Sequence, residues 1–85
     1  MEALNKLTKL GFTCVEPTDK DKTYFFAKHA EKGKHTTQIW IVLRRIPEIT
    51  IKEDYETVVE PASELEEALA EFLGELGYDN YKIVL

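Results

Sequence analysis

One short pattern ends two predicted helices, and it constrains the fold more than any other feature of the chain. It occurs at residues 7–12 (LTKLGF) and again at residues 73–78 (LGELGY). In both copies a leucine-containing turn stops at a glycine, which adopts the left-handed backbone conformation that commonly ends a helix. The aromatic residue that follows can fold back on the last turn. The pattern predicts one helix over residues 2–10 and a second that ends at residue 76.

The second helix also has signals at its start. Pro61 suits a first turn, and Ser63 with Glu66 has the spacing of a capping box, so we expect Ser63 to act as a helix cap. Apolar residues then recur at the helical period, at Leu65, Ala68, Leu69, Phe72, Leu73 and Leu76.

The segment between the helices is predicted to form strands. They cover residues 12–15, 23–29, 36–45 and 48–51; the last continues through 55–59 with a bulge, and residues 81–85 add a terminal strand. This order, α-β-β-β-β-α(-β), predicts an α+β fold with an antiparallel sheet of four to five strands and two helices. A chain of 85 residues has room for one hydrophobic core, so we expect a single α+β domain over residues 1–85.

The longest predicted strand is apolar on both faces. Ile39 and Ile41 point one way, and Trp40 and Val42 point the other. The strand at residues 23–29 also carries aromatic residues on both faces, whereas a sheet with one solvated face normally alternates apolar and polar residues.

Two arrangements explain this pattern. The helices cover opposite faces of the sheet, or the terminal strand and loops cover the second face. Alternatively, both helices pack on the Ile39 and Ile41 face and leave the other partly exposed, as an interface for a protein partner or a homodimer. The residues expected on that exposed face are Trp40, as the anchor, with Val42, Tyr24 and Phe26.

Charge is divided between the two halves of the chain. Residues 1–45 carry a formal +4 and residues 46–85 a formal −9, which together give the −5 of the whole chain. On the second helix four glutamates fall within one narrow arc, and we call them the acidic ridge: Glu64, Glu67, Glu71 and Glu75. The ridge is either a solvated face that keeps the protein soluble or a docking surface for a basic partner.

Residue types that carry chemistry occur in structural settings. Cys14 is expected to be a small buried strand residue and not a nucleophile, and no glycine-flanked nucleophile pattern surrounds Ser63. His29 and His35 flank a predicted hairpin loop and supply at most half of a zinc site. We therefore expect no enzyme activity, metal, cofactor or small-molecule substrate.

Nucleic-acid binding is the alternative function. The order of elements resembles double-stranded RNA-binding domains, but the second helix opens with Glu64, Glu66 and Glu67, where a phosphate-binding helix needs cations. The alternative therefore depends on a basic hairpin in the first half of the chain, with candidate residues Lys28, Lys32, Lys34, Arg44 and Arg45.

The expected location is the cytoplasm, without membrane association. The chain has one cysteine, no apolar run of the roughly 20 residues that cross a bilayer, and no signal-peptide pattern at its start.

The layout as a whole resembles small orphan α+β proteins of bacteriophages and prophages: a helix ending in Leu-Gly-Phe, aromatic hairpins, and a last helix ending in Leu-Gly-Tyr. The resemblance implies a non-enzymatic accessory protein or inhibitor, of the kind that binds and blocks host factors. From these observations we expect a protein-binding module that uses the acidic ridge, the Trp40 face, or both.

Overall fold

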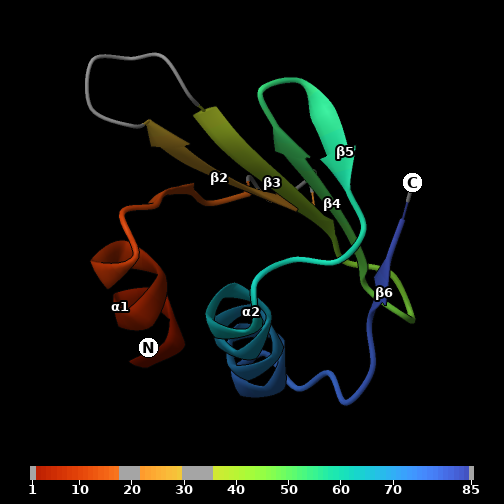
Figure 1. Cartoon of the computed structure of the whole chain (residues 1–85). Helices are drawn as coiled ribbons and strands as arrows, with labels where there is room; N and C mark the ends of the chain where they lie inside the picture. Colours follow the sequence, from red (N-terminus) through yellow and green to blue (C-terminus); the bar gives the residue numbers. More distant parts are fainter. Residues whose placement is uncertain (1, 18–21, 30–35, 85) are drawn as a thin grey trace.

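The computed structural model describes residues 2–17, 22–29 and 36–84, and it shows two helices and an antiparallel sheet (Figure 1). The predicted α+β class is confirmed, although the sheet contains six short strands where four to five were expected. In chain order the elements are α1 Glu2–Lys9, β1 Thr13–Val15, β2 Thr23–His29, β3 Thr36–Val42, β4 Glu48–Glu53, β5 Glu56–Val58, α2 Ser63–Glu75 and β6 Lys82–Ile83.

The first five strands form an antiparallel sheet in sequence order, β1-β2-β3-β4-β5. Two short strands, β5 and β6, pair with the same edge of β4. β5 pairs with residues 51–53 of β4, and β6 pairs in parallel with Glu48 and Ile49. The predicted terminal strand is therefore real but short, and it closes the lower half of an edge that β5 leaves unpaired.

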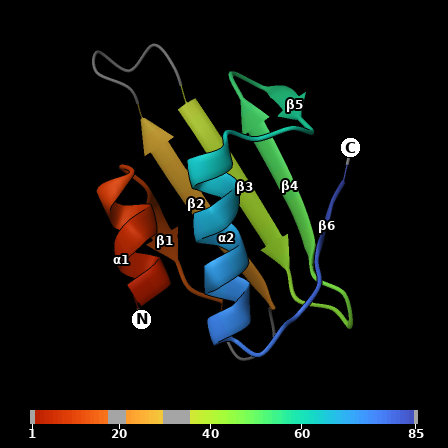
Figure 2. The same ribbon diagram turned by 60° about the horizontal axis from the view of Figure 1, so that its bottom comes forward.

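Both helices lie on the same side of the sheet. Figure 2 shows α2 across the middle of the sheet and α1 toward the β1–β2 side. The two helices run antiparallel, because the start of α1 meets the end of α2. The core fills the space between helices and sheet. Its fully buried side chains include Leu7, Phe26, Ile39, Ile41, Ile49, Ile51, Leu69, Phe72 and Leu73. Of the two arrangements considered above, both helices on one face is the observed one.

The predicted helix ends are confirmed at both sites. Gly11 and Gly77 have φ of 100° and 97°. The aromatic residue after each glycine donates its backbone N–H to the leucine five residues earlier, Phe12 to Leu7 at 3.0 Å and Tyr78 to Leu73 at 2.9 Å. Each glycine N–H bonds to the carbonyl three residues before it, so both helices end in the same Schellman motif.

The predicted start of α2 is wrong in its details. The N-cap position is Ala62, and no side-chain hydrogen bond caps the helix. Ser63 is already the first helical residue, so it does not act as the cap. The Glu66 carboxylate instead accepts a hydrogen bond from the Tyr81 hydroxyl at 3.0 Å, which ties the C-terminal segment to the helix.

The segment from residue 48 to 59 is a hairpin, not one bulged strand. Asp54 and Tyr55 have φ of 49° and 71°, as in the two-residue type I′ turn that joins twisted antiparallel strands. The Asp54 N–H donates to the Thr36 carbonyl oxygen, and the Thr36 N–H donates to the Asp54 carboxylate. These two bonds fix the turn against the start of β3.

Candidate binding surfaces

The sheet face opposite the helices carries a central pair of aromatic side chains. Strand pairing places Val15, Phe25, Trp40 and Thr50 in one row across four strands. The Phe25 and Trp40 rings lie 5.2 Å apart between centroids with an interplanar angle of 47°. Both residues are half-buried, and Val15 is 57% exposed. None of the described helices or strands lies over this row (Figure 1), and we call this side of the sheet the open face.

Charged side chains stand on both sides of the aromatic row, along β4. Because Ile49 and Ile51 point into the core, Glu48, Thr50 and Lys52 point to the open face. The Lys52 ammonium lies 6.0 Å from the centroid of the Trp40 ring. The Glu48 carboxylate forms a salt bridge with Arg44, in which 3.3 Å separates Arg44 Nε from a carboxylate oxygen. The open face thus combines an aromatic centre with Lys52 on one side and the Arg44–Glu48 ion pair on the other.

The predicted position of Tyr24 and Phe26 is wrong, since both lie on the helix-covered face. Tyr24 pairs with the core residue Ile41, and its ring meets Phe72 edge-on with centroids 5.0 Å apart. Burial, followed by the nearby charge of Glu16, raises the pKa of Tyr24 above its ordinary value. Tyr24 therefore belongs to the periphery of the core.

Sequence reasoning did not propose Phe25, Lys52 or Glu48 as site residues. The signal that identifies Phe25 is cross-strand register: Phe26 pairs with the inward-facing Ile39, so Phe25 must face outward beside Trp40. Periodicity within one strand separates the two sets of side chains but does not show which set faces the helices.

The acidic ridge lies partly against α1. The Glu71 carboxylate pairs with the Lys6 ammonium at 2.5 Å, and this hydrogen bond raises the pKa of Lys6. The Glu75 carboxylate accepts the backbone N–H of Ala3 at 3.2 and 3.4 Å, at the positive end of the α1 dipole. Half of the ridge is therefore engaged within the molecule.

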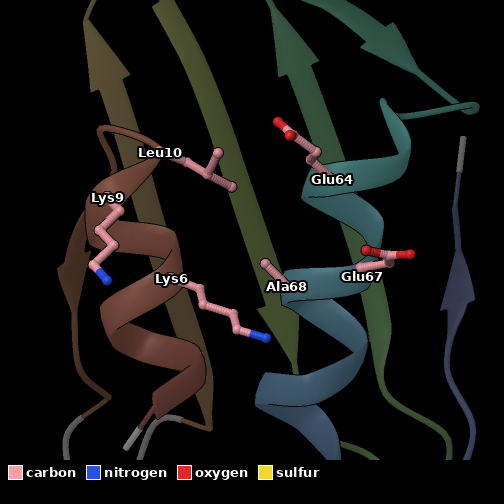
Figure 3. Close-up of a pocket in the computed structure, with 6 residues that line it drawn as sticks. All are labelled: Lys6, Lys9, Leu10, Glu64, Glu67 and Ala68. Atoms are coloured by element: carbon pink, nitrogen blue, oxygen red, sulfur yellow. The ribbon is translucent and has the colours of Figure 1, made fainter.

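The other half of the ridge borders a groove between the helices. Figure 3 shows Lys6, Lys9 and Leu10 on the α1 side, with Glu64, Glu67 and Ala68 on the α2 side. In this view the carboxylates of Glu64 and Glu67 lie apart from the two ammonium groups, and both residues are exposed.

The basic residues of the nucleic-acid alternative do not gather into one surface. Lys28 is on the helix-covered side, with its ammonium 5.8 Å from the Phe12 ring centroid. Arg44 and Arg45 lie in the β3–β4 connection, at the opposite end of the β2–β3 hairpin. Lys32 and Lys34 lie outside the described residues.

The residues considered for chemistry show no shared site. Burial, with a smaller contribution from Glu16, raises the pKa of the Cys14 thiol, which lowers the fraction present as the nucleophilic thiolate. His35 and the His29 side chain lie outside the described part of the chain. Among residues 2–17, 22–29 and 36–84, no three His, Cys, Asp or Glu side chains are grouped so that they could hold a metal ion.

Comparison with known proteins gave no match, neither to a protein-family model nor to a curated protein or a solved structure. Over the described residues, neither helix combines the length and the apolar character needed to cross a lipid bilayer.

Proposed function

We propose that this protein is a small, non-enzymatic protein-binding module whose contact surface is the open face. The observation that carries the proposal is the Phe25–Trp40 pair at the centre of a sheet face that has no helix over it. Tryptophan is among the side chains that contribute most to protein interfaces, and central aromatic anchors surrounded by polar residues are typical of them.

The acidic ridge has a secondary part in this proposal. Glu71 and Glu75 already bind α1, so only Glu64 and Glu67 remain for a partner. Two exposed carboxylates can speed the approach of a basic partner, but exposed charges usually add little affinity. An accessory protein that binds another protein and blocks it is the role that fits this surface and the prophage-like layout. The free thiol of Cys14 suits the reducing cytoplasm.

Affinity capture with three forms of the chain tests the proposal. The wild type is compared with Trp40→Ser on the open face and with the control Glu64→Lys/Glu67→Lys on the ridge. Circular dichroism establishes that each variant keeps its fold. We expect the captured protein to be lost with Trp40→Ser and retained with the ridge variant.

The opposite pattern would contradict the proposal, because it would assign binding to the ridge. Retention on single-stranded DNA or RNA that disappears with Trp40→Ser would instead favour the nucleic-acid alternative, since exposed aromatics also stack on bases.

A further inference from the structure

The charges on the open face are arranged so that the face complements itself. Along β4 the outward residues are Glu48, Thr50 and Lys52, with the acidic and basic ends placed symmetrically about Thr50. Trp40 is paired with Thr50, so the aromatic row passes through the point midway between the two charges. Turning the face by half a turn about this row exchanges the positions of Glu48 and Lys52.

We propose that a second copy of this chain covers the open face, in a two-fold dimer whose axis runs along the Val15–Phe25–Trp40–Thr50 row. This inference rests on the proposed protein-binding function and names the partner. With this axis the two sheets pack face to face, Trp40 of one copy meets Trp40 of the other, and each Glu48 lies opposite Lys52 of the second copy. An axis along β4 would instead stack Glu48 on Glu48, which like-charge repulsion disfavours.

The composition of the face favours a second copy over a nucleic acid. Glu48 would repel a phosphate backbone, whereas a second copy places Lys52 opposite Glu48. A strongly basic protein is a poorer match, because the acidic ridge carries more negative charge than the open face, which has charges of both signs. A second copy covers the aromatic row and places Lys52 opposite Glu48, in addition to the Arg44–Glu48 pair within each copy.

The size of the face sets the expected strength of the dimer. The strands β1 to β5 have 3, 7, 7, 6 and 3 residues, and spacings of about 4.8 Å between strands and about 3.3 Å along them give a footprint of roughly 410 Å² per copy. Stable interfaces bury about 800 Å² on each partner, so this dimer is expected to be weak and to dissociate on dilution.

Sedimentation over a range of protein concentrations tests the inference with charge variants. The variants are Lys52→Glu, Glu48→Lys and the double exchange. Each single change places like charges opposite each other at both symmetry-related contacts, and we expect it to weaken dimerisation at least tenfold. The double exchange restores opposite charges and should restore the dimer. Glu67→Lys and Lys9→Glu, which make the same charge changes away from the open face, should dimerise like the wild type.

Several results would overturn the inference. They are a wild type that stays monomeric at every concentration, a dimer that survives both single changes, or a double exchange that stays monomeric while folded. A monomeric wild type that loses a captured protein with Trp40→Ser would refute the dimer and leave the protein-binding function standing. A chain that neither self-associates nor captures a protein would refute both.

Discussion

Replacing Phe72 by alanine tests how strongly α2 is joined to the sheet. The side chain is fully buried, and its ring meets Phe26 and Tyr24 edge-on at centroid distances of 5.4 and 5.0 Å. Removing a buried phenylalanine costs about 3 to 5 kcal/mol, and the loss of two aromatic pairs places Phe72→Ala toward the upper end, at about 4 to 5 kcal/mol. A domain of this length is stable by about 4 to 13 kcal/mol, so the variant should lose a large part of its free energy of unfolding.

Phe25→Ala is the matched control, since it removes the same side chain from the opposite face. Phe25 is half-buried and contacts the Trp40 ring, so we expect a loss of about 1 to 2 kcal/mol in the monomer. Urea unfolding followed by circular dichroism measures both losses at low protein concentration. Equal losses for the two variants would refute the reasoning, because they would show that the open face is covered as completely as the core.

Three further predictions concern pH and the backbone. Burial raises the pKa of Tyr24 and of Tyr81, so the stabilisation by their protonated forms is fully present below pH about 10. Urea unfolding should show that the free energy of unfolding falls as the pH rises through the raised pKa values. A free energy of unfolding that stays constant to about pH 11 would contradict this. Tyr55→Gly should raise the free energy of unfolding by about 1 kcal/mol in thermal denaturation, because glycine accepts the positive φ of the β4–β5 turn without strain; an unchanged melting temperature would count against that turn. Gly77→Ala should lower the free energy of unfolding by about 1 to 2 kcal/mol, because alanine is strained at the positive φ of this residue. Gly74→Ala, inside α2 with open space around it, should raise the free energy of unfolding by about 0.5 to 1 kcal/mol. Equal effects of the two substitutions would contradict the assigned helix end.

The parts of the fold that depend on local sequence were predictable. Gly11 and Gly77 were expected to end the helices, and they do so with the same hydrogen bonds. All the hydrogen bonds of this helix end join residues within one six-residue segment, so the local sequence is enough to predict it.

The parts that depend on pairing between distant strands were not predictable in the same way. Tyr24 was placed on the wrong face because alternation within β2 says nothing about which set of side chains meets Ile39 and Ile41. The β4–β5 turn was missed because Asp54 and Tyr55 lack the glycine that usually marks a type I′ turn, and contacts with Thr36 hold the turn instead. The role of Ser63 as a cap was wrong because the Glu66 N–H bonds to the Ala62 carbonyl, so the helix begins one residue earlier and Ser63 is already helical.

Contacts between the two helices explain part of the charge division between the halves of the chain. The end of α2 meets the start of α1, where Glu71 pairs with Lys6 and Glu75 accepts the Ala3 N–H. Like charges spaced along one helix repel each other when the helix is alone, but here two of the four are compensated by the neighbouring helix. The acidic ridge therefore has a structural role that accounts for half of its residues. On the open face the Trp40 ring contacts Phe25 and the Lys52 ammonium but stays partly exposed, which makes that face the stronger candidate for binding.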